Sequence, residues 1–487
     1  MSSPARRPAV AVIGGGISGL AAAYFLRERG LAVTVFEGSA AVGGKLSVSE
    51  VAGVAVDEGA ESLLARRPEG TDLISDVGLA GELTVPGTTA AGLWTRGALR
   101  RLPARQVMGV PADVDELGRT GIVSPAGLAR AREDEARPAT GRDGDVSVAG
   151  YVGARLGDEV VDRLVDPLLG GVYAGRAQEL SFDATLGPLA AAARQHRSLA
   201  EAAGSLLPPA PPPGTPRQPV FTTLRRGLGT LPPAVAVASG AVVRTRAMVR
   251  ELARTPGGWR LTVGSAHAPG YAEADAVILA VPARPASRLL AGVPGAAQAA
   301  AGLAEIGYAS MAIVTLAYPQ DAFARPPSGS GYLVPAIDGH PVKAVTFSSV
   351  KWPHLAGQAV QVVRCSLGRV GEEAVLQRDD AELAGLAAAD LALATGVAGP
   401  PAEVRVTRWG GGLPQYNVGH LDRVRRIRAG VAGLVGLSVC GAAYDGLGIP
   451  ACIASADLAA RQVLDYLAAR RGQAAAPGSA GDVAVGE

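Results

Sequence analysis

AVAVI at residues 9–13 leads into GGGISG at residues 14–19, and a second apolar run, AVTVF at residues 32–36, ends at the acid Glu37. This order of strand, glycine turn, helix, strand and carboxylate is typical of a nucleotide-binding βαβ unit. Glycine keeps the turn tight, lets the backbone approach a diphosphate, and lets the helix pack closely on the strand. The phosphates are expected on the helix N-terminus. Glu37 is placed to accept hydrogen bonds from both ribose hydroxyls.

The residues after the glycine turn favour a nucleotide site over an ordinary glycine-rich loop. Residues 21–29 are rich in alanine with bulky side chains at helical spacing, and Gly30 follows as the expected C-cap. Arg6 and Arg7 precede an apolar stretch and superficially resemble a twin-arginine export signal. The glycine spacing and the acid at the end of the second strand argue against export.

Composition bounds the class of protein. A chain of 487 residues with 48% hydrophobic and 18% charged residues is expected to fold into two or three domains of a soluble protein. The net charge of +2 gives no pull toward nucleic acid, and leaves membrane contact peripheral at most. Three scattered cysteines indicate a reducing compartment, expected to be the cytoplasm, and the dispersed histidines predict no metal site. The longest uncharged apolar stretch, residues 430–444, is too short to span a membrane.

A second glycine pair suggests which nucleotide is bound. This pair, Gly43 and Gly44, follows the ribose acid closely and is itself followed by Lys45. Gly44 and Lys45 offer another place where backbone meets a phosphate or a ribityl chain. An extended flavin dinucleotide needs such a contact and NAD does not, although a plain turn with a solvated lysine is the alternative. Near the carboxyl end, Ile449 and Pro450 open a helix whose N-terminus would stabilise negative charge on a reduced flavin.

The order of the remaining segments predicts a discontinuous nucleotide domain. Runs 248–253 and 259–263 flank TPGG and predict a hairpin, and run 274–282 is expected to be a buried strand that returns to the nucleotide domain. Residues 305–412 alternate strand-like runs with one helical stretch, which predicts a second sheet facing a substrate. Residues 118–145 are rich in charged residues, glycine and proline, which predicts a loose connection.

Three later motifs are more specific than the glycine turn: DPLLGGVYAG at 166–175, LPQYNVGH at 413–420, and residues 440–453. Together with the amino-terminal fingerprint they resemble the oxygen-dependent coproporphyrinogen III and protoporphyrinogen IX oxidases of the flavin amine oxidase superfamily. The resemblance implies an α/β fold like that of monoamine oxidase, in which a Rossmann-like FAD-binding domain joins a mixed α+β substrate domain with a helical part. The expected boundaries are 8–85, 222–288 and 431–473 for FAD, 86–109 and 289–430 for the substrate sheet, 110–207 for helices, 208–221 for a proline-rich linker and 474–487 for a disordered tail.

Leu102-Pro103 and VMGVP at 107–111 resemble the monoderm bacterial branch, which oxidises coproporphyrinogen III to coproporphyrin III in haem biosynthesis, with O2 as acceptor and H2O2 as product. The alternatives are a protoporphyrinogen IX oxidase, a flavin amine oxidase or desaturase that uses Lys343 or Lys351, and a porphyrin carrier without activity. A transient contact with ferrochelatase, the next enzyme, is also implied.

Matching motifs imply the cofactor contacts, with the backbone of Val249 at the adenine edge. They are Gly14, Gly15, Gly16, Ile17, Ser18, Gly19, Glu37, Gly44, Lys45, Gly59, Ala60, Glu61, Ser62, Val249, Trp409, Gly441, Gly448, Ile449 and Pro450. Two departures from the family pattern are Arg226, where glycine is more frequent, and Ala442, where the wider superfamily often has Asp.

We assign no catalytic side chain, because the flavin N5 carries the chemistry and the protein supplies proximity and orientation. Arginine suits propionate groups, so Arg100, Arg101 and Arg105 are the candidates to hold them, although any one of the three could equally be solvated. Further candidates to line the substrate slot, each of which could instead be a core residue, are Met108, Tyr173, Tyr416 and His420.

Overall fold

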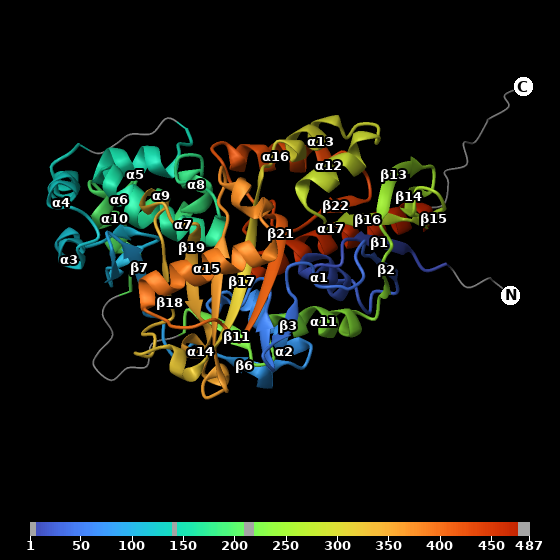
Figure 1. The fold of residues 1–487 in the computed structure, drawn as a ribbon. Coiled ribbons are helices and arrows are strands. Elements are labelled where there is room, and N and C mark those ends of the chain that lie inside the picture. The colour runs from blue at the N-terminus through green and yellow to red at the C-terminus, as the bar shows by residue number, and fades with distance from the viewer. Residues whose placement is uncertain (1–5, 139–143, 209–218, 476–487) are drawn as a thin grey trace, which may run out of the picture.

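In the computed structural model, which describes residues 6–138, 144–208 and 219–475, a five-stranded parallel sheet forms one end of the molecule (Figure 1). Its strand order is β12-β2-β1-β16-β22. Three distant parts of the chain supply these strands, so the predicted discontinuity is confirmed. The bounds are β1 (Ala9–Ile13), β2 (Ala32–Phe36), β12 (Val242–Arg244), β16 (Ala276–Leu279) and β22 (Leu437–Val439).

Alternate residues of the parallel strands face two different cores, as the period of a strand requires. Val10 and Val12 pack with helices α1 (Ile17–Phe25), α11 (Leu231–Ser239) and α17 (Ile449–Ala475). Ala11 and Ile13 face the opposite way, and pack with a three-stranded antiparallel sheet and with three helices. These elements are β13 (Val249–Thr255), β14 (Gly258–Gly264), β15 (Pro269–Ala274), α12 (Ala283–Ala291), α13 (Ala297–Ala304) and α16 (His420–Ala432). The predicted hairpin is thus confirmed as β13 and β14.

Helix α1 is shorter than predicted. It ends at Phe25 with Leu26 as its C-cap, rather than continuing to Arg29. Gly30 does adopt a left-handed conformation, at φ +66°, but it does so in the turn into β2. A left-handed glycine marks any tight reversal of the chain and does not by itself fix a helix end.

The second sheet has seven strands in the order β21-β17-β20-β19-β18-β7-β8. Its predicted strands and the helix α15 (Asp380–Thr395) are confirmed. Val314 and Cys365 belong to the face packed on α15. Ile313 and Ser366, on the other face, are only partly buried. The bounds are β7 (Ala91–Thr95), β8 (Ala98–Arg101), β17 (Tyr308–Pro319), β18 (Gly331–Leu333), β19 (Val342–Phe347), β20 (Val360–Leu367) and β21 (Glu403–Pro414).

A helical part lies at the end of the molecule away from the parallel sheet (Figure 1). The predicted loose connection at 118–145 is wrong for most of its length, because it contains the end of α3, all of α4 and a turn at Glu133–Glu135. Asp113 and Ser124 cap these helices through their side chains. Residues 139–143 lie outside the described part. The helices are α3 (Val114–Thr120), α4 (Pro125–Arg132), α5 (Val148–Leu156), α6 (Asp158–Val160), α7 (Asp166–Tyr173), α8 (Phe182–Thr185), α9 (Gly187–Ala192) and α10 (Leu199–Ser205).

Short strands and two helices complete the described chain. They are β3 (Val48–Val51), β4 (Val54–Asp57), β5 (Leu63–Leu64), β6 (Leu83–Thr84), β9 (Gln106–Val107), β10 (Val110–Pro111), β11 (Phe221–Leu224), α2 (Pro68–Asp76) and α14 (Ser348–Lys351). Phe221 pairs with Leu64, so the predicted linker ends before it. Helix α17 runs two residues into the predicted tail, and the rest of both predictions, residues 209–218 and 476–487, lies outside the described residues.

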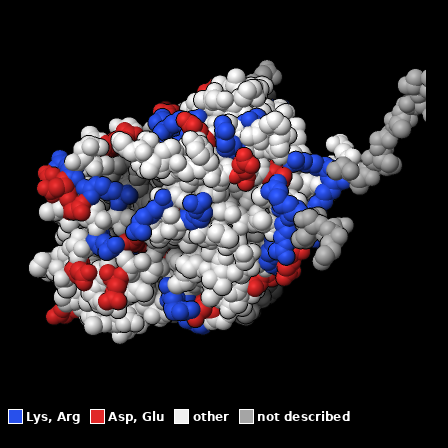
Figure 2. All heavy atoms as spheres, turned by 90° about the vertical axis from the view of Figure 1, so that its right-hand side faces the viewer, with Lys and Arg blue, Asp and Glu red and all other residues white. Residues whose placement is uncertain are grey.

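The surface of the described residues agrees with the small net charge. On the face that forms the right-hand side of Figure 1, charged side chains occur in groups separated by uncharged surface (Figure 2). No helix within the described ranges is both long and apolar enough to cross a membrane.

Candidate cofactor site and domain seam

The three fingerprint glycines stand in three different environments. A Cβ on Gly14, whose φ is +110°, would lie 2.5 Å from the carbonyl oxygen of Ala280. A Cβ on Gly19 would lie 1.9 Å from the carbonyl oxygen of Gly14, so α1 approaches β1 too closely for any side chain. Gly16 begins α1, and a Cβ there would meet no described atom within 4 Å. The turn is therefore packed from behind at Gly14 and Gly19 and open in front at Gly16.

Glu37 stands directly over this turn. One carboxylate oxygen accepts a hydrogen bond from the backbone N–H of Gly15 at 2.7 Å, and the other accepts from the N–H of Ser39 at 2.7 Å. An ionised carboxylate has four acceptor positions, so two remain for ribose hydroxyls. The N–H of Ala247 donates to the carbonyl of Glu37, which brings the start of β13 and the predicted adenine contact Val249 to the same edge of the sheet.

The second glycine pair lies against the first. The N–H of Gly43 donates to the carbonyl of Gly15 at 2.8 Å, and a Cβ on Gly44 would lie 3.4 Å from the Cα of Gly16. Burial lowers the pKa of Lys45, and no carboxylate of the described residues forms an ion pair with this lysine. A half-buried cation without an anionic partner, beside an open helix N-terminus, fits the diphosphate of a dinucleotide.

The carboxyl-terminal loop meets the amino-terminal turn. A Cβ on Gly441 would lie 3.8 Å from the hydroxyl of Ser18, and the N–H of Gly441 donates to the hydroxyl of Ser455 in α17. The loop is held further by Tyr416, whose hydroxyl donates to the carbonyl of Ala442 at 2.6 Å and accepts from the N–H of Gly446 at 2.8 Å. The N-termini of α1 and α17 thus lie next to one another, and Gly448–Pro450 opens the second of them.

The segment Gly59 to Ser62 lies between the two domains, and this boundary is named here the domain seam. A Cβ on Gly59 would lie 2.1 Å from the carbonyl oxygen of Lys45, so the segment packs directly against the second glycine pair. Trp409, from β21, donates its indole N–H to the carbonyl of Glu58 at 3.0 Å. The backbone of this segment is therefore beside the cofactor residues, as the motif implies.

The side chain of Glu61 points into the substrate domain. It pairs with Lys351 of α14 and with Arg364 of β20, both at 2.5 Å. Burial alone would raise the pKa of the Glu61 carboxyl group. The two neighbouring cations outweigh that effect and lower this pKa to about 2. The sequence predicts that Glu61 contacts the cofactor. In the structure its carboxylate forms ion pairs with Lys351 and Arg364, so only its backbone is available for a cofactor. Arg364 was missed, although a charged residue inside the apolar strand VQVVRCSL is itself a signal.

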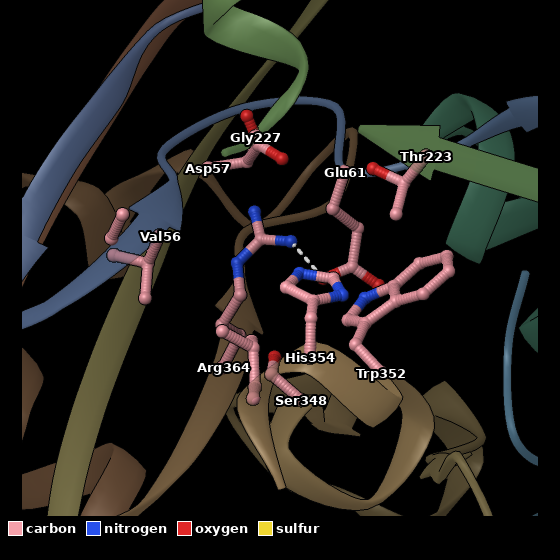
Figure 3. Close-up of a pocket in the computed structure, with 11 residues that line it drawn as sticks. Val56, Asp57, Glu61, Thr223, Gly227, Ser348, Trp352, His354 and Arg364 are labelled. Carbon is pink, nitrogen blue, oxygen red and sulfur yellow. Dashed lines mark hydrogen bonds and ion pairs between the residues drawn. The ribbon is translucent and has the colours of Figure 1, made fainter. Parts of the chain in front are cut away.

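A small cavity adjoins this ion pair (Figure 3). Its lining includes Asp57, Glu61, Ser348, His354 and Arg364, and its volume is about 20 Å³. Burial raises the pKa of Asp57 to about 6, opposed by hydrogen bonds from the N–H groups of residues 228 and 229. A cavity of this size accommodates about one water molecule. It is part of the domain seam and not the place where a macrocycle binds.

Two of the predicted aromatic slot residues are stacked, and the third lies beside them at an angle. The rings of Tyr416 and His420 lie 3.9 Å apart and nearly parallel, and Tyr173 lies 5.6 Å from Tyr416. Burial lowers the pKa of His420 to about 4, so its ring is neutral near pH 7. Met108 packs on the helical core that also contains the two tyrosines. The structure therefore brings Tyr173, Tyr416 and His420 together as buried residues, and places Met108 against the same helical core.

The predicted propionate arginines are half-buried or exposed. Arg100 donates to the carbonyl of Thr95, while Arg101 and Arg105 are exposed. Among the described side chains, no hydrogen bond or ion pair joins these arginines to the aromatic stack. The departure at Arg226 is harmless, since that side chain is exposed and Gly227, at φ +85°, makes the turn.

One face of the seven-stranded sheet is directed at the domain seam. Arg364 and Ser366 point to the same side of β20, and Arg364 reaches Gly59 across the seam at 2.7 Å. Ser366 is in register with Ile313 and Ala344, and Ala344 is in register with Leu333. These four side chains are uncharged and only partly buried. They provide an uncharged surface on the side of the sheet from which Arg364 reaches the domain seam.

These features together define a two-domain flavoprotein oxidoreductase, in which an open glycine turn, a ribose acid and a half-buried lysine fit FAD. The sequence model of a protein family, described as flavin containing amine oxidoreductase, matches residues 17–464 of this chain. The chain belongs to this family and, within it, to the porphyrinogen oxidases. It is an FAD-dependent enzyme.

Individual proteins support this assignment. Coproporphyrinogen III oxidase of Mycobacterium tuberculosis (strain ATCC 25618 / H37Rv) is 39% identical over 465 residues, which cover 94% of this chain and 98% of that protein. The crystal structure of a candidate protoporphyrinogen oxidase from Exiguobacterium sp. 255-15 superposes with a TM-score of 0.83 at 30% identity, covering 95% of this chain and 99% of that one. Cyclohexylamine oxidase from Brevibacterium oxydans IH-35A has a TM-score of 0.69 at 16% identity, covers 95% of this chain and 100% of its own, and shares the fold.

Proposed function

We propose that this enzyme oxidises coproporphyrinogen III to coproporphyrin III, with O2 as the final acceptor and H2O2 as the second product. The observation that carries the proposal is the full-length similarity to the Mycobacterium tuberculosis protein named coproporphyrinogen III oxidase. The cofactor residues support it, because an open Gly16, the free acceptor positions of Glu37 and the unpaired Lys45 suit FAD.

The chemistry asked of the side chains is limited. Each meso carbon of a porphyrinogen lies between two electron-rich pyrroles that stabilise developing positive charge, so the protein has no need of a strong base. When bound, FAD supplies the acceptor for hydride. The protein supplies orientation and apolar surface, for which the partly exposed row of Leu333, Ala344, Ser366 and Ile313 is suited.

Four propionates distinguish coproporphyrinogen from protoporphyrinogen, which has two. Arg101 and Arg105 are exposed and free to pair with such groups, and Arg100 already donates to Thr95. We therefore assign the outer propionates to Arg101 and Arg105. A charge-assisted pair of this kind contributes about 1.5–3 kcal/mol where water is partly excluded.

The test compares the two porphyrinogens. Oxidised enzyme is mixed anaerobically with each of them in turn, and bleaching of the flavin absorption is followed by stopped flow. We expect coproporphyrinogen to reduce the flavin faster, and each reoxidation of the flavin by O2 to release one H2O2, which makes three for each coproporphyrin formed. Equal or reversed rates would assign the chain to protoporphyrinogen, and binding without bleaching would indicate a carrier.

A lysine-dependent amine oxidase is not favoured by the lysines themselves. Lys343 is buried and donates to the carbonyl of Gly368 at 2.7 Å, and Lys351 pairs with Glu61. Both are therefore committed to protein partners.

Two further parts of the proposal concern the setting of the enzyme. The three cysteines are unpaired and buried, which agrees with a reducing compartment, and we infer the cytoplasm. A transient contact with ferrochelatase would pass the product on. Co-sedimentation of the two purified proteins with and without coproporphyrin tests that contact, and no complex under either condition would remove it.

A further inference from the structure

Two basic side chains of the substrate domain hold the segment Gly59 to Ser62 at two points. Arg364 donates one guanidinium N–H to the carbonyl of Gly59 at 2.7 Å and another to the carboxylate of Glu61 at 2.5 Å. Lys351 donates to the second carboxylate oxygen of Glu61 at 2.5 Å. Figure 3 shows the Arg364 guanidinium turned toward Glu61. One planar fork thus grips the backbone and the side chain of a single segment.

The other side of this segment faces the cofactor residues. Gly59 packs against the carbonyl of Lys45, and the N–H of Ala60 donates to the same carbonyl at 3.4 Å. Lys45 in turn follows Gly44, which touches Gly16. Any movement of Gly59 is therefore passed within two contacts to the glycine turn at the start of α1.

The three side chains are charged and buried. The exposed fractions are 8% for Arg364, 13% for Glu61 and 16% for Lys351. Two cations share the carboxylate of Glu61, and Asp57, which lines the same cavity, is a further acid close to Arg364 at the boundary of the two domains. Buried charges are costly unless hydrogen bonds satisfy them, and here the two terminal nitrogens of Arg364 have partners while its Nε has none among the described residues.

We propose that Arg364, Glu61 and Lys351 form a positioning clamp, which fixes residues 59–62 against the Gly44-Lys45 turn and so couples the substrate sheet to the bound flavin. The clamp rests on the proposed function in that residues 59–62 contact FAD. None of its side chains is a catalytic residue. Through the segment it holds, the clamp sets the affinity and the electronic environment of the flavin.

The decisive variant is Arg364→Lys, which keeps the charge and loses the fork, because one ammonium cannot hold Gly59 and Glu61 in the same planar geometry. The matched control is Arg405→Lys. Arg405 pairs with the neighbouring Glu58 at 2.5 Å in the same seam, but its side chain is 47% exposed. An exposed pair contributes little, so this control keeps position and chemistry while removing burial.

Three quantities are measured on the purified holoenzymes: the dissociation constant of FAD, the visible absorption and midpoint potential of the bound flavin, and the thermal unfolding temperature. For Arg364→Lys we expect FAD to bind about tenfold more weakly or worse, the factor that corresponds to about 1.4 kcal/mol. We also expect a shifted flavin spectrum and potential at saturating FAD. A merely structural role would lower the unfolding temperature and leave spectrum and potential unchanged.

The proposal is overturned if Arg364→Lys and Arg405→Lys agree within twofold in FAD affinity and have the same spectrum. If Arg364→Lys does not fold, Lys351→Gln is measured in its place, because this second variant leaves both Arg364 hydrogen bonds intact. We expect Lys351→Gln to change FAD affinity and the flavin spectrum in the same direction as Arg364→Lys, by a smaller amount. No shift in that variant also overturns the clamp. A wild type that binds FAD but leaves coproporphyrinogen unoxidised would contradict the proposed substrate alone, since the clamp readouts do not require turnover.

Discussion

At the scale of single residues, the cofactor site depends on groups whose hydrogen bonds the protein itself only partly satisfies. Glu37 uses two acceptor positions on backbone N–H groups, and Lys45 has no anionic partner among the described residues. Removing such a group affects the ligand more than the fold, because little of its bonding is internal.

Glu37→Ala should therefore release FAD. The variant loses the ribose acceptor and the bond to Gly15 that fixes the glycine turn, and we expect FAD affinity to fall about 10- to 100-fold, as for the loss of a charged hydrogen bond. Flavin occupancy after desalting measures the effect. Glu50→Ala, at an exposed position of β3, is the control, and equal occupancy in the two variants would contradict the assignment.

Lys343 predicts a pH dependence of stability. Burial lowers the pKa of its ammonium group to about 7 from the ordinary 10.5. Between these values the unfolded chain binds one more proton than the folded chain, so this lysine makes the free energy of unfolding rise with pH. Below about pH 7 the lysine is charged in both the folded and the unfolded chain, so burial of the ammonium group lowers the free energy of unfolding by its full amount.

Lys343→Met removes that cost at similar volume. The variant should be stabilised most near pH 7, with a gain that shrinks toward pH 10, while porphyrinogen oxidation continues. Thermal unfolding across this range measures it, with the exposed Arg288→Met as control. A constant difference at all pH values would contradict the burial argument, and loss of oxidation would revive a lysine-dependent mechanism.

At the scale of elements, the glycine turn separates packing from binding. Gly16→Ala places its Cβ in the open space before α1, so we expect unfolding free energy to change by about 1 kcal/mol or less while FAD binding weakens at least about tenfold. Gly19→Ala drives its Cβ into the carbonyl of Gly14 and should destabilise the fold by about 1–3 kcal/mol or more. Unfolding curves and FAD titrations of both variants decide this, and equal loss of stability would contradict it.

Elements with a local signature were predictable from sequence. The βαβ unit, the hairpin β13–β14 and the opening of α17 at Ile449 each depend on residues close together in the chain. The end of α1 was misplaced because Gly30 serves a later turn. Helix α4 was missed because its polar composition hides the cap at Ser124, where a side-chain oxygen accepts from the N–H of Gly127.

The clamp was beyond sequence reasoning for a physical reason. Glu61 is 290 residues from Lys351 and 303 from Arg364 along the chain, and it meets them only when the two domains have formed. Spacing and composition carry no information about such a meeting. Much of the cofactor set came from the resemblance and not from geometry, and Val249 and Trp409 have no local signature of their own.

At the scale of the whole molecule, the two domains act as one unit because the seam is both polar and buried. Glu58, Gly59 and Glu61 all have partners on the second sheet or its helix α14. Two domains joined only by apolar side chains could shift relative to one another, whereas ion pairs with defined geometry fix one relative position of the two domains. The flavin residues and the uncharged sheet face are thereby held at a constant separation.

The last strand of the parallel sheet in chain order is made well after the other four strands. β22 forms an edge beside β16, and α17 covers the apolar side of α1. During synthesis on the ribosome, β16 therefore has a bare edge and α1 stays uncovered until residues 437–475 emerge. A chain terminated before residue 437 would expose apolar surface and an unpaired strand edge, and it would not retain its coenzyme. Such a chain would be prone to aggregation and a target for chaperones and proteases.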